Sequence, residues 1–450
     1  MTTRLGGLSD AGLLGGDRSR SGALLERYVR MVPGAAHTYA KGHDQYPAGC
    51  APFIVRGSGS HVWDADDNEY LEYGSGLRSV SLGHGHPRIV AAAARAMAGG
   101  TNFVRPTVLE VEVAEEFLSC FSGLDMVKFT KNGSDATTAA TRLARAVTGR
   151  DLIAICADQP FFSTDDWFIG STAMPAGIPR SVVESTVTFR YNDLESLRRV
   201  LQRFDGRVAC VVMEAATTSE PVPGFLEGVR RLCDSTGTIL VLDEMITGFR
   251  WHLGGAQHVY GLRPDLATFG KAMGNGFAVA ALAGRRDLMV RGGIDHEQER
   301  VFLLSSTHGA ETHALAVARE VIRVYEEDEV VATLTDRGTR LAEGVRAEAA
   351  ARGLQDHFLL LGRPANLVYA TLDQDLERSQ EFRALFLQET ICRGLLAPSF
   401  VPSAALSAAD VDRTVEIVGQ ALDVYARALD SGVHGLLRGR PVKPVLRPFA

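Results

Sequence analysis

The chain has 450 residues, and its 54 Asp plus Glu outnumber its 47 Lys plus Arg to give a net charge of −7. This length exceeds one ordinary domain, and 46% hydrophobic beside 22% charged residues is the composition of a soluble globular protein. The negative net charge argues against a nucleic-acid or membrane-surface partner.

The sequence also predicts a compartment. No apolar run approaches the roughly 20 residues of a membrane span, and residues 1–22 lack the continuous apolar segment of a signal peptide. Six cysteines are scattered without a Cys-x-x-Cys pair, as expected of reduced thiols rather than of a disulfide framework or a zinc site. We therefore expect a cytoplasmic protein.

The first part of the chain combines helices with short strands. We expect a loose arm over residues 1–20 and a helix over residues 21–31. Alternating residues around an Asp/Asn turn predict short antiparallel strands between residues 53 and 73. Two further helices are predicted over residues 87–99, which start with Pro and end in Gly-Gly, and over residues 108–121.

Strands and helices alternate in the middle of the chain. A helix is predicted over residues 134–148, and a long helix over about residues 313–327 leads into a more helical C-terminal half. Strands interleaved with helices predict an α/β fold with a mainly parallel sheet, followed by a small α+β domain. The predicted strands, most of them continuous apolar runs, are residues 127–130, 152–156, 208–213, 238–242, 266–269, 277–283 and 366–371.

Two of these strands deliver groups with complementary chemistry. The strand over residues 238–242 is followed at once by Asp243 and Glu244, and residues 266–269 lead to Lys271 in a Gly-rich loop. In open α/β sheets the reacting groups collect beyond the carboxyl ends of the strands. An amine and a carboxylate at this edge suit pyridoxal phosphate, since the amine forms a Schiff base and the carboxylate keeps the pyridine nitrogen protonated.

Lys271 is also conspicuous because lysine is scarce. The chain has only five lysines, at positions 41, 128, 131, 271 and 443, and otherwise uses arginine. Arginine cannot lose its proton or form an imine, whereas a lysine with a lowered pKa can do both. A surface lysine in a loop is the ordinary alternative, but the apolar, Gly-flanked setting of Lys271 and its pairing with Asp243 favour a catalytic role.

These stretches resemble a known family. Residues 240–251, LVLDEMITGFRW, and residues 264–276, PDLATFGKAMGNG, are similar to the signature of class III (ω-type) aminotransferases, which belong to fold type I of the pyridoxal phosphate enzymes. The branch that contains glutamate-1-semialdehyde aminomutase is the most similar, and the resemblance extends from about residue 33 to about residue 402.

The resemblance implies a domain plan and an assembly. Residues 61–325 are expected to form a large cofactor-binding domain with a mainly parallel, seven-stranded type of sheet. Residues 326–450 would form the small α+β domain, and residues 1–60 an N-terminal arm and segment that joins it. In this family Thr307 would reach the phosphate of the neighbouring subunit, which implies a homodimer with active sites at the interface.

The resemblance also assigns the groups that bind the phosphate and the ring. Asn132, Gly133 and Ser134 match the phosphate-binding turn, where N–H groups at a helix N-terminus meet an anion. A simple helix cap is the alternative interpretation of that turn. Phe161 would stack on the pyridine ring, although Phe162 and Ser163 replace the usual His and Gly and both Phe side chains can be core residues.

The strand ends supply the remaining cofactor contacts. Asp243 is the expected partner of the pyridine nitrogen. Met245, two residues further along the same strand and on the same face, would pack under the ring. Glu214 ends another strand on this rim, where Ala215 replaces the usual Pro. His84 and His86 form a His-x-His pair without a third ligand nearby, so we assign no metal.

The substrate-binding positions of this chain differ from those of the aminomutase branch. Thr38 and Lys41 stand where the aminomutase branch has Ser and Arg, so a bidentate carboxylate clamp is missing. Leu77 replaces a Trp of the family, with Arg78 beside it. The candidate substrate residues are therefore Lys41, Leu77, Arg78, Glu220 and Trp251.

We expect an aminotransferase that moves an amino group between a primary amine and a carbonyl acceptor through a Lys271 Schiff base. Arg78, Lys41 and the pair Arg250-Trp251 can bind an anionic substrate. The acidic groups near the site, Glu214, Glu220 and Glu311, equally suit a polyamine or an amino sugar, and an amino sugar or aminoglycoside 6-amine is the donor we expect. Two alternatives stay open. One is a pyridoxal phosphate isomerase, epimerase or aminomutase that retains the amine, and the other is a non-catalytic dimeric scaffold.

Overall fold

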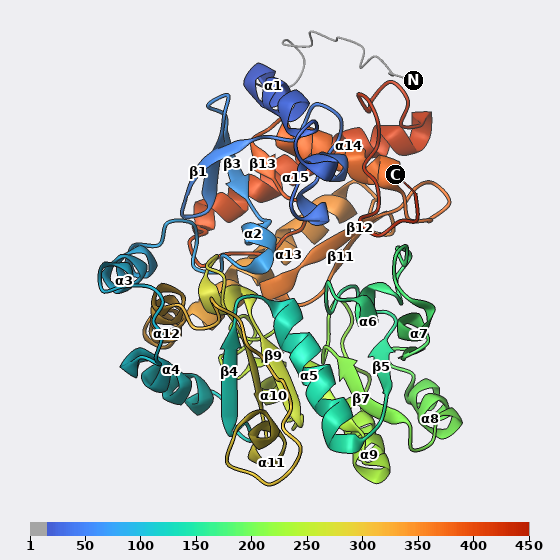
Figure 1. Cartoon of the computed structure of the whole chain (residues 1–450). Coiled ribbons are helices and arrows are strands. Elements are labelled where there is room, and N and C mark those ends of the chain that lie inside the picture. The colour runs from blue at the N-terminus through green and yellow to red at the C-terminus, as the bar shows by residue number, and fades with distance from the viewer. Residues whose placement is uncertain (1–15, 450) are drawn as a thin grey trace. The chain divides into compact units, whose positions relative to one another are not determined.

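The computed structural model describes residues 16–449, so most of the predicted N-terminal arm lies outside the described residues (Figure 1). The chain forms two compact units. Unit 1 consists of the described residues up to Gly74 together with Arg337–Val445, and unit 2 consists of Ser75–Asp336 with residues 446–449. The chain therefore passes between the two units after residues 74 and 336, whereas the sequence predicts domain boundaries after residues 60 and 325.

Unit 2 is built on one seven-stranded sheet with the order β4-β10-β9-β8-β7-β5-β6. Strands β9, β8, β7, β5 and β6 run parallel to one another, and β10 runs antiparallel to both of its neighbours. This sheet confirms the predicted α/β fold and its mainly parallel, seven-stranded arrangement. The strands are β4 (Met126–Thr130), β5 (Leu152–Cys156), β6 (Thr186–Phe189), β7 (Val208–Met213), β8 (Ile239–Asp243), β9 (Leu266–Phe269) and β10 (Ala280–Gly284).

The apolar runs become central strands because helices cover the sheet. Every residue of β5, β7, β8, β9 and β10 is buried, as expected of strands covered on both faces. Helix α5 (Gly133–Thr148) packs against β4 and β7 to β10 and presents small residues such as Ala136, Ala139 and Ala140 to the core (Figure 1). Small side chains allow a close helix–sheet contact that fixes where α5 begins.

Two strands of the seven-stranded sheet differ most from the sequence prediction. The edge strand β6, with the sequence TVTF, was not predicted, because three of its four residues are partly or fully exposed and it lacks a buried apolar run. Strand β10 starts at Ala280 rather than at residue 277, because a turn in which Phe277 N–H donates to Gly274 O (2.8 Å) occupies the preceding residues.

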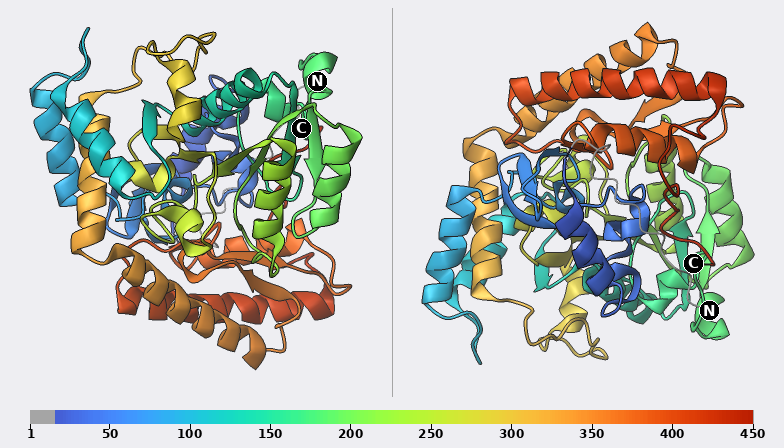
Figure 2. Two further views of the ribbon diagram at one scale, coloured as in Figure 1. Left: turned by 90° about the horizontal axis from the view of Figure 1, so that it is seen from below. Right: turned by 90° about the horizontal axis from the view of Figure 1, so that it is seen from above.

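The other helices of unit 2 connect the strands and form its flank. Helix α12 (Thr312–Glu327) packs against α3 (Pro87–Ala98) and α4 (Val108–Ser119), and these three lie side by side in Figure 2. Arg319 Nη1 and Nε bind Glu112 and Glu116 of α4 at 2.6 and 2.7 Å. The remaining elements are α2 (Ser75–Arg78), α6 (Asp166–Ile169), α7 (Arg180–Val183), α8 (Leu194–Arg203), α9 (Phe225–Thr236), α10 (Gly255–Val259), α11 (Arg286–Met289), η4 (Lys271–Gly274) and η5 (Val290–Gly292).

Unit 1 combines a four-stranded sheet of order β1-β2-β3-β13 with a two-stranded sheet of β11 and β12. Its first three strands are antiparallel, as predicted for residues 53–73. Its strands are β1 (Ile54–Ser58), β2 (His61–Asp64), β3 (Glu69–Glu72), β11 (Phe358–Leu361), β12 (Val368–Thr371) and β13 (Leu395–Leu396). Its helices are α1 (Ser19–Tyr28), η1 (Pro33–Ala35), η2 (Tyr39–Lys41), η3 (His43–Gln45), α13 (Val330–Ala351, which begins in unit 2), η6 (Pro364–Asn366), α14 (Gln380–Ile391) and α15 (Ala408–Ser431).

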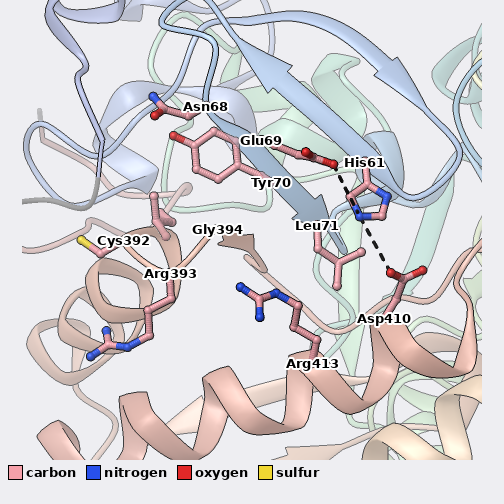
Figure 3. Close-up of a pocket in the computed structure, with 11 residues that line it drawn as sticks. His61, Asn68, Glu69, Tyr70, Leu71, Cys392, Arg393, Gly394, Asp410 and Arg413 are labelled. Atoms are coloured by element: carbon pink, nitrogen blue, oxygen red, sulfur yellow. Dashed lines mark ion pairs between the residues drawn. The ribbon is translucent and has the colours of Figure 1, made fainter.

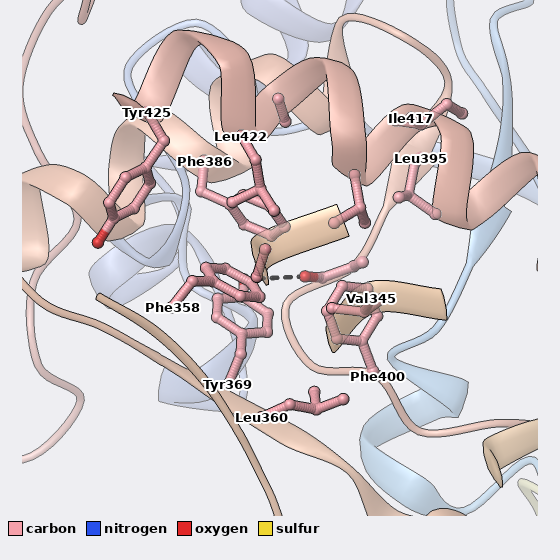
Figure 4. Close-up of a cluster of buried hydrophobic side chains, with 14 of the residues drawn as sticks. Val345, Phe358, Leu360, Tyr369, Phe386, Leu395, Phe400, Ile417, Leu422 and Tyr425 are labelled. Carbon is pink, nitrogen blue, oxygen red and sulfur yellow. Dashed lines mark hydrogen bonds between the residues drawn. The ribbon is translucent and has the colours of Figure 1, made fainter. Parts of the chain in front are cut away.

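The core of unit 1 combines aliphatic side chains with a group of aromatic rings (Figure 4). Phe358 lies 4.7 Å from Phe386 and stacks on Tyr369 at 5.4 Å between ring centroids. The buried Tyr369 hydroxyl donates a hydrogen bond to Ala397 O (3.0 Å), so its polar end is satisfied. Within residues 16–449, none of the helices has the length and apolar content needed to cross a membrane.

Candidate active site

The candidate site of unit 2 begins at the carboxyl end of β8. Asp243 is the last residue of this strand and is buried. Its Oδ1 accepts a hydrogen bond from Met245 N–H at 2.8 Å, so the chain turns directly after the strand. Burial raises the pKa of the Asp243 carboxyl to about 6, against the opposing effect of the Lys271 charge. The charge of the Lys271 amine therefore acts on this carboxyl.

Lys271 opens the turn η4 directly after β9 and Gly270. Its φ of 49° lies in the left-handed region, which is uncommon for a residue with a side chain. Burial lowers the pKa of the Lys271 amine, while the charges of Asp243 and Glu214 raise it. A cationic lysine is disfavoured in such a place, so the environment moves Lys271 toward the neutral amine that nucleophilic chemistry requires.

The turn that holds Lys271 is fixed by a side chain at its other end. Asn275 ends the turn with a left-handed φ of 40° and is buried. Its Oδ1 accepts from Leu82 N–H at 2.9 Å, and its Nδ2 donates to Gly83 O at 3.3 Å. The sequence interpretation quoted Asn275 within a Gly-rich loop and gave it no role. The Gly-Asn-Gly pattern is a turn signal, but its distant partners are visible only in the structure.

Met245 brings the predicted phosphate turn and the lysine turn together. A Cβ added to Gly133 would lie 2.8 Å from Met245 Sδ, and a Cβ added to Gly270 would lie at the same distance from that atom. A side chain at either position would therefore require the Met245 side chain to shift. The prediction that Met245 continues the strand on the face of Asp243 is wrong, because β8 ends at Asp243.

The amino end of α5 has the features of an anion site. This helix has 16 residues and starts at Gly133, and the N–H groups of its first turn lack partners within the helix. The side chain of Asn132 acts as the helix cap, since its Oδ1 accepts from Asp135 N–H at 3.0 Å. Ser134 Oγ accepts from Thr164 N–H at 2.9 Å and still has a proton to donate.

Glu214 is the third ionisable group of the cluster. It follows β7 and is buried, and its Oε2 has no hydrogen-bond partner among the described residues. Burial and the Asp243 charge raise the pKa of Glu214 to about 8, opposed by Lys271 and Arg78. A buried carboxyl oxygen without a hydrogen bond lowers the stability of the folded state. Such an oxygen is typical of a site that binds a further group.

Gln159 positions Glu214, and the sequence interpretation did not assign it a role. Gln159 Nε2 donates to Glu214 O at 2.7 Å, and Gln159 Oε1 accepts from Glu214 N–H at 2.9 Å. The buried amide thus holds both main-chain groups of the residue that carries the carboxyl. In the sequence, the one indication of a role for Gln159 is its position after the end of a strand, two residues before Phe161.

Glu244, the second carboxylate after β8, supports the fold around the site. Its Oε2 and Oε1 accept from Ala256 N–H and Gln257 N–H, both at 2.8 Å, and Thr247 Oγ1 also donates to it. Burial raises the pKa of Glu244 to about 7, and these hydrogen bonds lower it. Glu244 therefore connects the strand to the start of α10.

Phe161, predicted to stack on the cofactor ring, and Thr307, predicted to reach the neighbouring subunit, both lie on the surface of the described chain. Phe161 is 47% exposed and meets Phe168 edge to face at 5.4 Å, while Phe162 is a core residue. An exposed Phe161 is available to a ring, and its stacking role stays a prediction. Thr307 is exposed, and its carbonyl accepts from Asn102 Nδ2 at 2.8 Å. Its contact with a second subunit also stays a prediction.

The predicted substrate residues fall into three groups. Leu77 and Arg78 end the turn α2, which packs against η4. Glu220 Oε2 accepts from the Tyr260 hydroxyl at 2.7 Å, and the Tyr260 ring lies edge-on to Trp251 at 6.5 Å, so these two predicted residues share one neighbour. Lys41 belongs to unit 1, where it ends η2.

Glu311 is predicted, together with Glu214 and Glu220, to bind a cationic substrate. In the structure Glu311 is ion-paired with Lys131, and His308 Nδ1 lies 3.1 Å from its Oε1. Among these three acidic residues, Glu214 is the one with a buried carboxyl oxygen that lacks a partner within residues 16–449.

Unit 1 contains a pocket of about 550 Å³ that holds none of the predicted site residues (Figure 3). His61 points toward Asp410 and Glu69, with its Nε2 at 3.8 and 3.9 Å from their carboxylate oxygens. Within residues 16–449, the structure has no group of three or more His, Cys, Asp or Glu side chains arranged to hold a metal ion. The ionisable cluster of unit 2 is thus the candidate active site.

Comparisons with known proteins give the site a family context. Residues 39–357 match the sequence profile described as "Aminotransferase class-III". The chain is 31% identical over 432 residues to a protein of Syntrophobacter fumaroxidans named glutamate-1-semialdehyde 2,1-aminomutase, covering 90% of this chain and 97% of that one.

Solved structures show the same fold. The pyridoxal phosphate internal aldimine form of the FumI protein of Sphingopyxis sp. MTA144 matches with a TM-score of 0.84 and 26% identity, covering 94% of this chain and 99% of that one. An ω-transaminase from Sphaerobacter thermophilus matches with a TM-score of 0.81 and 26% identity, covering 90% and 97% of the two chains.

The residues of the site fit pyridoxal phosphate. The start of α5 offers N–H groups and the Ser134 hydroxyl to a phosphate. Asp243 offers a buried carboxylate to a protonated ring nitrogen, and Lys271 offers an amine whose pKa is lowered. The orphaned Oε2 of Glu214 indicates that this polar cluster accepts a further group.

The raised pKa of Glu214 predicts how the stability of the cofactor-free chain depends on pH. The folded state binds this proton more tightly than the unfolded state, because the pKa of the carboxyl rises from 4.5 to about 8. Its contribution to stability is therefore full below pH 4.5 and is lost as the pH rises toward 8. Glu214→Gln, which stays neutral, is expected to lose less stability over this interval.

Urea unfolding of both proteins at a series of pH values measures this difference. Glu297→Gln, at an exposed loop position, is the matched control and should follow the wild-type curve. Parallel curves for wild type and Glu214→Gln would show that Glu214 is ionised in the folded chain at neutral pH.

Proposed function

Because the chain belongs to the class III aminotransferase family and its cofactor is pyridoxal phosphate, we propose that Lys271 carries out amino transfer between a primary amine and a carbonyl acceptor. In the overall reaction the donor amine becomes a carbonyl, and the acceptor carbonyl becomes an amine. The observation that carries the proposal is that the half-buried Lys271 and the buried Asp243 and Glu214 follow strands at the carboxyl edge of the sheet, where their charges act on one another.

The proposed roles follow from the chemistry of each side chain. Lys271 Nζ attaches the cofactor and then, once displaced by a substrate amine, moves the proton of the carbon that bears the nitrogen. When bound, pyridoxal phosphate withdraws electrons from that carbon. Asp243 holds a negative charge at the ring nitrogen, and Gly133 and Ser134 hold the phosphate at the start of α5.

We further propose an amino sugar or aminoglycoside 6-amine as the donor. A carboxylate substrate needs a bidentate guanidinium at the positions of Thr38 and Lys41, and neither residue supplies one. A cationic donor instead suits a site with a buried carboxyl, and Glu214 supplies that group.

A glutamate-1-semialdehyde type of aminomutase is the second candidate, favoured by the relative with that name at 31% identity. An isomerase or epimerase belongs to the same class, since the amine stays with the substrate in each case. Consumption of an added keto acceptor separates these enzymes from a transaminase. The alternative of a non-catalytic scaffold is set aside because the chain belongs to an enzyme family and has both Lys271 and Asp243.

Amine donors are tested with the holoenzyme, a keto acceptor and a panel that includes aminoglycosides and glutamate-1-semialdehyde. We expect acceptor consumption with an amino sugar, a loss below detection in Lys271→Ala, and a fall in kcat of about 10²–10⁴-fold in Asp243→Asn. Lys128→Ala, on β4, is the matched lysine control and should retain activity. Full activity of Lys271→Ala would contradict the proposed role of this lysine.

We also propose a homodimer in which Thr307 completes the partner's phosphate site, supported by the exposed position of Thr307. Co-expressed Lys271→Ala and Thr307→Ala chains would then form hybrid dimers with one intact site, and about a quarter of wild-type activity should return. Activity no higher than the sum of the two separate variants would contradict an active site shared between subunits.

The expected cytoplasmic location stays a proposal as well. It is supported by the six cysteines, which are all free thiols in the structure. Fractionation of cells that express the chain tests it, and recovery outside the cytoplasmic fraction would contradict it.

A further inference from the structure

The turn α2 has an uncommon backbone. Ser75, Gly76, Leu77 and Arg78 have φ values of 44°, 56°, 59° and 73°, so four successive residues are left-handed. Single left-handed residues are common, but each one with a side chain costs roughly 1–2 kcal/mol. Backbone strain of this kind persists only where surrounding contacts impose it, and it concentrates at functional sites.

Local hydrogen bonds hold the turn in part. Val80 N–H donates to Ser75 O at 2.9 Å, and Ser79 Oγ donates to Gly76 O at 2.7 Å. A Cβ added to Gly76 would lie 2.8 Å from Val80 Cγ2 and 2.9 Å from Ser79 Oγ. A side chain at position 76 would therefore displace Ser79 and Val80 and strain the turn.

Arg250 supplies the contact from outside the turn. It is the largest fully buried side chain among the described residues. Its Nη2 donates to Arg78 O at 3.1 Å. Burial lowers the pKa of Arg250 to about 10, so the chain keeps a guanidinium where desolvation opposes its charge. Phe249, directly before it, is also left-handed with a φ of 57°.

The turn faces the reacting groups. α2 packs against η4, the turn that Lys271 opens. The Arg78 charge acts on Glu214 and on Lys271. Movement of the Arg78 main chain would therefore move a cation away from the proposed catalytic lysine.

We propose that Arg250 is a positioning residue, which holds the left-handed turn through the Arg78 carbonyl and so keeps the Arg78 guanidinium beside Glu214 and Lys271. The proposal rests on the proposed role of Lys271 and assigns a purpose to the strained turn. The positioning effect passes through Arg78, whose carbonyl accepts the Arg250 hydrogen bond, and it adds to the direct effect of the Arg250 charge on Lys271.

The expected consequence concerns the pH range in which Lys271 is neutral. Burial lowers the pKa of the Lys271 amine. The charged groups that act on it are Asp243 and Glu214, which raise the pKa, and Arg78 and Arg250, which lower it. Loss of the positioning contact lets Arg78 move away, and Lys271 should then hold its proton to higher pH.

The first test measures Lys271 in the full chain freed of cofactor. Brief acetylation at a series of pH values, followed by peptide mass spectrometry, gives the pH midpoint of labelling for each of the five lysines. Arg250→Met should raise the midpoint of Lys271 by about one pH unit, the order expected when a nearby buried charge is displaced. The exposed Lys41 is the internal reference.

A double-mutant cycle then separates position from charge. If Arg250 acts through Arg78, the midpoint shift of the double variant will be smaller than the sum of the shifts of Arg250→Met and Arg78→Met. Gly76→Ala gives independent support, because it displaces Ser79 and Val80 and strains the turn while both arginines remain, and it should also raise the Lys271 midpoint. It further keeps the proposal testable if Arg250→Met does not fold.

Arg150→Met is the matched control. Arg150 also donates to main-chain carbonyls, those of Val208 and Thr236 at 3.0 and 2.9 Å, but beside the opposite end of the strands. This variant should lose stability and leave the Lys271 midpoint unchanged. The proposal is overturned if Arg250→Met does not shift the midpoint, if the two arginine shifts add in full, or if Gly76→Ala has no effect.

The holoenzyme gives a second measurement, since the pH midpoint of its visible absorption should also rise in Arg250→Met. Labelling of Lys271 in the cofactor-free chain does not depend on cofactor binding. Failure of the positioning role is therefore distinguishable from failure of the proposed catalytic function.

Discussion

The balance of charge among Asp243, Glu214 and Lys271 is the constraint on which the rest of the site depends. The two carboxyls are buried at the carboxyl edge of one sheet, where burial raises the pKa of each acid and lowers the pKa of the amine. These groups can stay there because each charge partly offsets the others. The same balance makes the amine reactive, since a lysine closer to neutrality is a better nucleophile and base.

The backbone around this cluster is shaped for close approach. Gly133 and Gly270 both lie against Met245 Sδ, so the start of α5 and the end of β9 pack on the same Met245 side chain. The left-handed residues Lys271 and Asn275 lie in one turn, and the left-handed turn α2 packs against it. Local strain thus accompanies the ionisable groups, as in many sites where geometry is set by the fold.

The sequence was sufficient for the main parts of this arrangement. Apolar runs predicted the central strands, and Asp243 and Lys271 were recognisable because each follows such a run. The two hydrogen bonds between the Gln159 side chain and the Glu214 main chain were not predictable, because they join residues 55 positions apart through main-chain atoms. Nor was the turn α2, since Leu77 and Arg78 are not residue types that signal a left-handed backbone. Both features arise from tertiary contacts.

The account depends most directly on the attachment of the cofactor to one lysine. Borohydride reduction of the holoprotein, followed by peptide mass spectrometry, would fix the attached pyridoxyl group and identify its position among the five lysines. We predict modification of Lys271 alone, with no fixation in Lys271→Ala. Fixation at another lysine, or none after saturation with pyridoxal phosphate, would contradict the active site described for unit 2.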